Sequence, residues 1–192
     1  QEVTRRQCHA LNRRAMEEAE QEEVYKISLR RNQAKITTAR RRVIAPCMER
    51  AQKLGAPAAA MELDDGQLVT GKTSSLLGAS AALLLNAIKV LGCIPHNVHL
   101  IAPSAIEPIQ TLKTQYMGSK NPRLHTDEVL IALSMSAATD STAKKALSQL
   151  PKLRGCQVHT SVMLSDVDIK VFKKLGVELT SEPVYEHKKL YH

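Results

Sequence analysis

The stretch DDGQLVTGKTSS, residues 64–75, decides the fold expected for this chain. From Gly66 to Thr73 it has the G-x-x-x-x-G-K-T spacing of a phosphate-binding P-loop. A P-loop follows directly on a buried strand, whereas DDG is typical of a tight turn and QLVT alternates like a returning strand. The later apolar run VHLIAPS also lacks the closing acidic residue that would hold magnesium. We therefore predict a β-hairpin over residues 56–71, with nucleotide binding through GQLVTGKT as the alternative.

An apolar helix is predicted directly after the hairpin, from residue 73 to a stop at Gly92. Free backbone amides and the dipole at the start of such a helix favour an anion, and Lys72 adds a positive charge. The alternative is that Thr73 or Ser74 simply caps the helix. We predict that a phosphate or carboxylate binds at this junction. The residues expected to bind it are Gly71, Lys72, Thr73 and Ser74.

Beyond residue 92, apolar β-type runs alternate with segments of helical pattern. Strands are expected at 97–103, 156–164 and 177–183. Helices are expected at 104–117 with Ser104 as cap, at 126–138, at 140–153 with Asp140 as cap, and at 165–176. This alternation predicts a three-layer α/β subdomain over residues 56–192, with a mixed sheet of about five strands.

Residues 1–55 differ from the remainder in composition and are expected to form a helical segment. Helices are predicted over 3–34 and 38–54, the second ending at Gly55. This segment holds 13 lysines and arginines against 7 acidic residues, and so carries most of the net charge of +8. Aromatic residues make up only 3% of the chain and no nucleic-acid-binding motif is present, so we do not expect nucleic acid as a partner.

The overall composition indicates a cytoplasmic protein without a membrane segment. No apolar run reaches the roughly 18 residues of a membrane helix, and the charged N-terminus does not resemble a signal peptide. The four cysteines form no C-x-x-C pair, so we expect reduced thiols, with no metal and no cofactor. Because the chain begins at Gln1 without methionine, we expect it to be part of a larger protein.

The loop KNPRLHTDE, residues 120–128, is the best candidate for a functional site. Lys120 and Arg123 would attract an anionic small molecule, and Ser104 at another helix start is added to the same anion-binding set. His125 would serve as acid or base, because imidazole titrates near neutrality. The alternative is a structural loop in which Thr126 caps the next helix, followed by first-turn acids that suit its dipole.

Two other polar groups carry weaker signals. Serines near 134–141 have no readable base beside them, so we predict capping and packing roles for them. Cys156 and His159 are three residues apart on a predicted strand, where their side chains point to opposite faces. We therefore expect Cys156 to be a core thiol and His159 to be an imidazole unrelated to it. If residues 120–128, Lys72 and His159 instead lie in one cleft, that arrangement would favour a functional site.

The order strand, DDG turn, strand ending in TG and alanine-rich helix resembles the opening of the cytidine-deaminase fold. In that fold a P-C-x-x-C motif and a ligand-x-Glu motif hold zinc and the catalytic acid. Here Pro103 is followed by Ser104 and Glu107, and the earlier helix offers only Ser80 to Ala82. The resemblance therefore implies the topology without the zinc ligands.

Longer segments, residues 65–89, 99–156 and 160–185, resemble the C-terminal part of an uncharacterised bacterial family, domain of unknown function 1846. This resemblance implies architecture and no reaction. It makes the N-terminal part of a parent protein the expected partner, and we also expect a homo-oligomer. We predict a non-catalytic C-terminal module that contributes an anion-binding pocket; the alternative is part of an enzyme acting on a phosphorylated or carboxylated small molecule.

Overall fold

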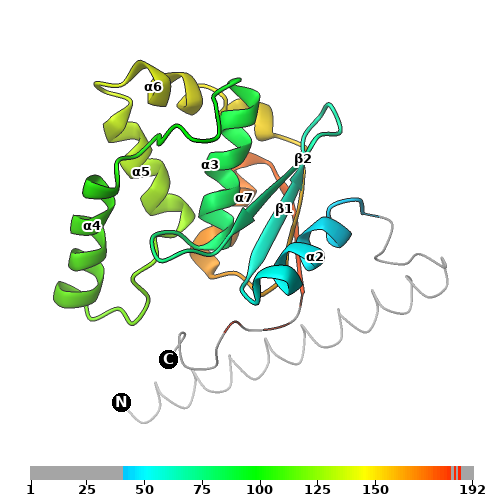
Figure 1. Ribbon diagram of the computed structural model, residues 1–192, viewed down its shortest axis with the longest axis horizontal. Helices are drawn as coiled ribbons and strands as arrows, with labels where there is room; N and C mark the ends of the chain where they lie inside the picture. The colour runs from blue at the N-terminus through cyan, green and yellow to red at the C-terminus, as the bar shows by residue number, and fades with distance from the viewer. Residues whose placement is uncertain (1–40, 183, 185, 187–192) are drawn as a thin grey trace, which may run out of the picture. The chain divides into compact units, whose positions relative to one another are not determined.

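The predicted hairpin is present in the computed structural model of the chain, which describes residues 41–182, 184 and 186 (Figure 1). Strand β1 (Ala58–Glu62) pairs antiparallel with β2 (Leu68–Lys72). In the turn, Gly66 has a φ of 80° and the backbone N of Gln67 donates to Oδ1 of Asp65 over 2.9 Å. The hairpin interpretation is confirmed, because the second half of the P-loop-like motif is a paired strand.

The sheet has four strands in the order β2-β1-β3-β4. Strand β3 (Gln157–Thr160) runs antiparallel to β1, and β4 (Glu178–Ser181) runs parallel to β3, so the sheet is mixed. The strand predicted over 97–103 was wrong, since this run is a loop whose Leu100 and Ile101 are nevertheless buried. Both edges of β1 are occupied by β2 and β3, and the apolar side chains of the loop are buried outside the sheet instead.

The two faces of β1 bury different neighbours because side chains alternate along a strand. Ala60 packs with Val43 and Cys47 beside helix α2 (Ile44–Leu54). The opposite face packs in the main core with α3 (Ala79–Leu91), whose Leu83 and Leu84 are fully buried. Helix α2 ends at Gly55, with φ of 61°, as predicted.

Gly71 is required by the contact between the hairpin and α3. A Cβ atom at this position would lie 2.3 Å from the backbone N of Leu83 and 2.5 Å from the carbonyl oxygen of Ala79. Close by, Nδ2 of Asn86 donates to the carbonyl oxygen of Thr70 over 2.9 Å. The TG sequence that ends the hairpin therefore lets a helix pack directly on the strand backbone.

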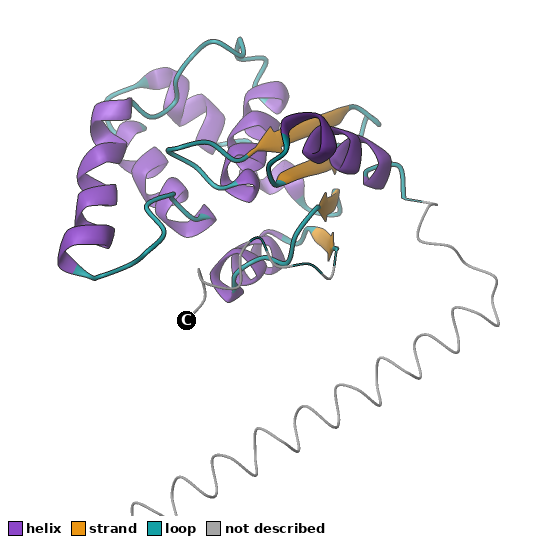
Figure 2. Ribbon diagram, turned by 60° about the horizontal axis from the view of Figure 1, so that its bottom comes forward, coloured by secondary structure: helices purple, strands orange, loops and turns teal. Residues whose placement is uncertain are grey.

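The remaining helices lie on the same side of the sheet as α3, away from α2 (Figures 1 and 2). They are α4 (Pro103–Thr111), which continues into a π-helical turn η2 (Leu112–Tyr116), then α5 (Thr126–Ser136), α6 (Ser141–Leu147), the 3₁₀ turn η3 (Leu150–Leu153) and α7 (Asp166–Leu175). In the part of the chain that the structure describes, no helix is long and apolar enough to cross a membrane. The helix predicted over 3–34 lies outside the described residues, and the predicted division at residue 55 stays a prediction.

Candidate functional site

The candidate site lies where the starts of three helices meet. The segments that lead into α3 and α5 run side by side, since the backbone N of Gly78 donates to Leu124 O over 3.2 Å and Leu124 N donates to Leu76 O over 2.9 Å. The start of α7 adds a third wall to a cleft of about 40 Å³. Polar or charged side chains lining this cleft are Thr73, Ser80, Asn121, Arg123, His125, Ser165, Asp168 and Glu186.

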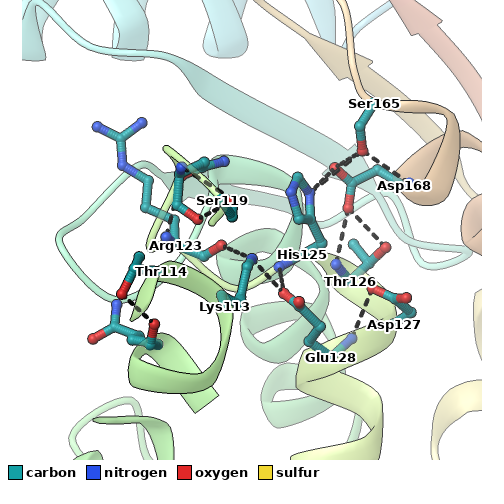
Figure 3. A network of polar contacts seen from close by, with 12 residues as sticks. Lys113, Thr114, Ser119, Arg123, His125, Thr126, Asp127, Glu128, Ser165 and Asp168 are labelled. Carbon is teal, nitrogen blue, oxygen red and sulfur yellow. Dashed lines mark hydrogen bonds and ion pairs between the residues drawn. The ribbon is translucent and has the colours of Figure 1, made fainter. Parts of the chain in front are cut away.

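Asp168 is the most buried acid of the site, with 4% of its surface exposed. Its Oδ1 accepts hydrogen bonds from the backbone N and Oγ1 of Thr126, over 2.9 and 2.8 Å. Its Oδ2 accepts from Oγ of Ser165 over 2.9 Å and lies 3.1 Å from Nδ1 of His125 (Figure 3). Burial alone would raise the pKa of Asp168, but hydrogen bonds from His125 and Thr126 outweigh it and hold the pKa below its usual value. Asp168 is therefore an ionised, fully hydrogen-bonded carboxylate.

His125 is oriented by this carboxylate. An ionised carboxylate only accepts hydrogen bonds, so Nδ1 of His125 carries a proton and Nε2 is the ring atom left for other chemistry. The hydrogen bond to Asp168 raises the pKa of His125 above its usual value, although burial and the charge of Lys113 oppose the rise. The side chain is 26% exposed and lines the cleft. It can thus offer a positive N–H group to an anion, or exchange a proton at Nε2.

Ser165 completes a Ser-His-Asp group whose geometry does not activate a nucleophile. Its Oγ lies 3.3 Å from Nδ1 of His125, the same ring nitrogen that faces Asp168. A serine nucleophile needs its hydroxyl on the opposite ring nitrogen, which then takes its proton. Here the hydroxyl donates to Asp168 and caps α7 by accepting from the backbone N of that residue over 3.3 Å. The group therefore holds the imidazole ring in place.

Lys113, in the π-helical turn η2, fixes the backbone on the other side of His125. Only 7% of this lysine is exposed, and its Nζ donates to Arg123 O over 2.6 Å and to Oε2 of Glu128 over 2.8 Å (Figure 3). The same Oε2 accepts from the backbone N of His125 over 2.8 Å. The loop from residue 123 to 128 is thus fastened to η2 and to its own helix before any ligand binds.

Arg123 brings the second positive charge to the cleft. Its Nη1 lies 2.5 Å from Oε1 of Glu186, and both side chains are partly buried. The backbone N of Arg123 donates to Oδ1 of Asn121 over 3.1 Å, which shapes the loop just before His125. The wall of the cleft therefore contains the positive charge of Arg123, which is paired with the carboxylate of Glu186.

Residues 39–191 match the family described as "Domain of unknown function DUF1846, C-terminal". The chain belongs to this family. A UPF0371 protein of Corynebacterium glutamicum (strain R) is 52% identical over 191 residues, which cover 100% of this chain and 39% of that protein. The UPF0371 protein SpyM50764 of Streptococcus pyogenes serotype M5 (strain Manfredo) is 44% identical, with the same two coverages. The chain thus spans about 39% of the length of these relatives, and the resemblance to a bacterial family is confirmed.

In this DUF1846 domain, the anion site predicted at the end of the hairpin is dispersed. Helix α3 begins at Ala79 and not at Thr73, because Oγ of Ser74 accepts from the backbone N of Leu77 over 3.0 Å and forms a turn first. Thr73 lines the cleft, whereas Lys72 is exposed and does not line it. Gly71, as described above, is buried beneath α3.

The other predicted residues divide in the same way. Arg123 and His125 line the cleft together, while Lys120 is exposed and outside its lining. Ser104 was wrongly predicted as a cap, since α4 begins at Pro103, with the extended residue before it at the N-cap position, and Ser104 is exposed away from the cleft. His159 is buried in β3, where its two ring nitrogens contact the side chains of Thr180 and Glu182. It does not line the cleft.

The sequence interpretation of this DUF1846 domain missed the partners of His125. The pattern Ser-Asp-Val-Asp at 165–168 predicts a capped helix with an acid in its first turn, and that cap is present. Thr126 was expected to cap α5, but His125 holds the N-cap position and Oγ1 of Thr126 donates to Asp168 instead. A first-turn acid that bonds to another helix is not distinguishable in sequence from one that bonds within its own.

Proposed function

We propose that this DUF1846 domain is a non-catalytic module of a longer protein, to which it contributes an anion-binding cleft. The family description names a C-terminal domain, and the relatives are more than twice as long as this chain, which supports a role within a larger protein. The N-terminal part of such a protein is its proposed partner. Self-association stays a prediction, for which light scattering of the full-length protein is the measurement.

The convergence of Arg123 and His125 on one cleft is the observation that supports anion binding most strongly. Both side chains carry or acquire a positive charge, while the charge of Asp168 is buried and already met by hydrogen bonds. Within the described residues no side chain caps α3, and Ala79 and Ser80 of its first turn line the cleft, so the uncapped start of this helix is available to an anion. The cleft volume of about 40 Å³ suits a phosphate or carboxylate group, not a whole metabolite.

The alternative is that the cleft is part of an active site for a phosphorylated or carboxylated small molecule. One observation favours it: Asp168 orients His125 and raises its pKa, as in a general acid or base. Another observation argues against it. Oγ of Ser165 lies beside Nδ1 of His125, the nitrogen that carries the proton, so the imidazole does not serve this serine as a base. Catalysis would then require a group from the remainder of the longer protein.

The likeness to the cytidine-deaminase fold also remains a proposal. The hairpin followed by the buried alanine-rich α3 supports it. Ser104 and Glu107 occupy the positions of the two zinc cysteines in that fold, and among the described residues no three His, Cys, Asp or Glu side chains are grouped to hold a metal ion.

Calorimetric titration with inorganic phosphate and with acetate tests the proposed function. We expect binding to the wild-type protein and a loss of at least tenfold in affinity for Arg123→Met and for His125→Gln. The matched variants Arg154→Met and His96→Gln change exposed residues outside the cleft and should bind like the wild type. Equal affinity of all five proteins, or no binding by any of them, would overturn the proposal.

A further inference from the structure

We propose that the ligand joins an anionic head, held by Arg123 and His125, to an apolar body that fills a neighbouring chamber. This inference rests on the proposed function and adds the class of ligand. Beside the cleft lies a larger, open pocket of about 430 Å³, called the larger chamber below, which is lined by the end of α2, residues 55–57 and 161–162, and the single residues Val184 and Glu186. Its volume is within the range of roughly 300–1,000 Å³ that small-molecule pockets occupy.

The two cavities form one site with two chambers. They share four lining residues: Pro57, Arg123, Val162 and Glu186. The Arg123–Glu186 ion pair therefore stands at the junction, with the cleft of His125 on one side and the larger chamber on the other. A molecule bound through its anionic group at Arg123 can extend into the larger chamber, because Arg123 lines both cavities and the cleft itself has a volume of only about 40 Å³.

The walls of the larger chamber suit an apolar body. Met48 and Ala51 of α2 line it together with Val162 and Val184, and among the lining residues that the structure describes the only charged side chains are the two of the junction. The hydroxyl of Ser161 already accepts a hydrogen bond from the backbone N of Ala58 over 3.0 Å. The chamber thus offers apolar contact to the body of the ligand, and its charged side chains lie at the junction, where the anionic head would bind.

Glu186 occupies the place on Arg123 that the head of the ligand would take. Its Oε1 lies 2.5 Å from Nη1 of Arg123, a charge-assisted contact of the kind a phosphate or carboxylate oxygen would make. An incoming anion must displace this carboxylate or share the guanidinium with it. Removing its charge in Glu186→Gln should therefore raise the affinity for every anionic ligand, whatever the body.

Calorimetric titration of the protein with inorganic phosphate, methyl phosphate and phenyl phosphate tests the inference. The three ligands share a phosphate group, but only phenyl phosphate has an apolar body. We expect phenyl phosphate to bind at least tenfold more tightly than methyl phosphate, the gain from removing roughly 60 Å² of apolar surface from water. Equal affinities for these two ligands would overturn the inference and leave the proposed anion cleft intact; no binding of any of the three would overturn both.

Two variants locate the body within the larger chamber. Met48→Asp places a charge in the chamber, and Ala51→Leu fills part of it without a charge. Each should remove most of the advantage of phenyl phosphate and leave the affinity for methyl phosphate within twofold of the wild type. The matched variant Met135→Asp, on the exposed face of α5, should keep that advantage. An advantage that persists in Met48→Asp and Ala51→Leu, with thermal unfolding showing folded proteins, would place the body elsewhere and contradict the inference.

Discussion

Oδ2 of Asp168 lies 3.1 Å from Nδ1 of His125, and this contact joins the first turn of α7 to the N-cap of α5. The two residues are 43 positions apart in the chain. Because Oδ1 of the same carboxylate is bonded to the backbone N and hydroxyl of Thr126, the start of α5 is held at two adjacent residues. The contact therefore sets both the position of the imidazole ring and its protonation.

Anion binding should weaken as the pH rises through the pKa of His125. That pKa lies above its usual value of 6.5, so the ring is positive below it and loses its attraction for an anion above it. Sulfate is the suitable probe, since it keeps its charge between pH 5.5 and 9. We expect its affinity to fall at least fivefold across this range in the wild type and to stay flat in His125→Gln; a flat profile in both would exclude His125 from the site.

Replacing Asp168 by Asn should destabilise the domain and lower the pKa of His125. Loss of a buried, charged hydrogen-bond acceptor costs about 2–4 kcal/mol of the free energy of unfolding. Because the folded-state pKa of Asp168 is depressed, its stabilising effect is present above its usual pKa of 3.8 and disappears as pH falls through the lower folded value. Urea unfolding at pH 5 and at pH 3, both below the usual pKa of 6.5 of His125, measures this, and the stabilities of the wild type and Asp168→Asn should converge from the first pH to the second.

The pKa of the imidazole in Asp168→Asn, followed by NMR titration of its ring protons, is the second measurement. Without the carboxylate, the strongest influence that raises the pKa of His125 is lost, while burial and the charge of Lys113 still lower it. We expect the pKa of His125 to drop below that in the wild type. An unchanged pKa would mean that Asp168 does not control the protonation of the ring.

Replacing Lys113 by Met should loosen the loop before α5 while the remainder of the domain stays folded. The variant removes the donor to Arg123 O and Glu128 Oε2, at a cost of roughly 1–3 kcal/mol. Amide hydrogen exchange should become faster at residues 123–128 and stay unchanged in β1 and β3. Lys144→Met, an exposed lysine of α6, is the control and should leave both regions as in the wild type. Exchange that is no faster in this loop would contradict the positioning role of Lys113.

Gly71→Ala should be among the most damaging single-methyl changes in this domain. The added Cβ would lie 2.3 Å from the backbone N of Leu83, and a helix backbone cannot shift as a side-chain end can. We expect a loss of about 3 kcal/mol or more, at the upper end of overpacking effects. Gly78→Ala, where the nearest atom is 3.7 Å away, should cost about 1 kcal/mol or less as a change of N-cap residue. Thermal unfolding of the two variants compares them, and equal midpoints would contradict the packing role of Gly71.

The sequence alone was sufficient for the features that depend on neighbouring residues. The turn at Gly66, the end of α2 at Gly55 and the cap of α6 by Asp140 each follow from local backbone and side-chain preferences. The run at 97–103 shows where such preferences stop being sufficient. Burial of Leu100 and Ile101 was predictable from their apolarity, but whether they are buried in a sheet or in a loop depends on which strands already pair with β1.

About half of the candidate site could be predicted from the sequence. The polar loop at 120–128 pointed to Arg123 and His125, because such loops within a compact domain are often functional. Asp168 could not be paired with His125 from sequence, since contacts between distant segments depend on the packing of α5 against α7. Lys72 was wrongly placed at a helix start for a related reason. Its spacing from Gly66 is that of a P-loop lysine, but six residues separate it from the first residue of α3.

Amide and histidine chemical shifts measured during a phosphate titration test the anion cleft most directly. If the cleft binds the anion, the ring protons of His125 and the backbone amides of Ala79, Ser80 and Ala81 will shift together, with one dissociation constant. Shifts confined to Lys72 and its neighbours in the hairpin, or no shift at His125 under saturating phosphate, would contradict an anion site at the meeting of the three helices.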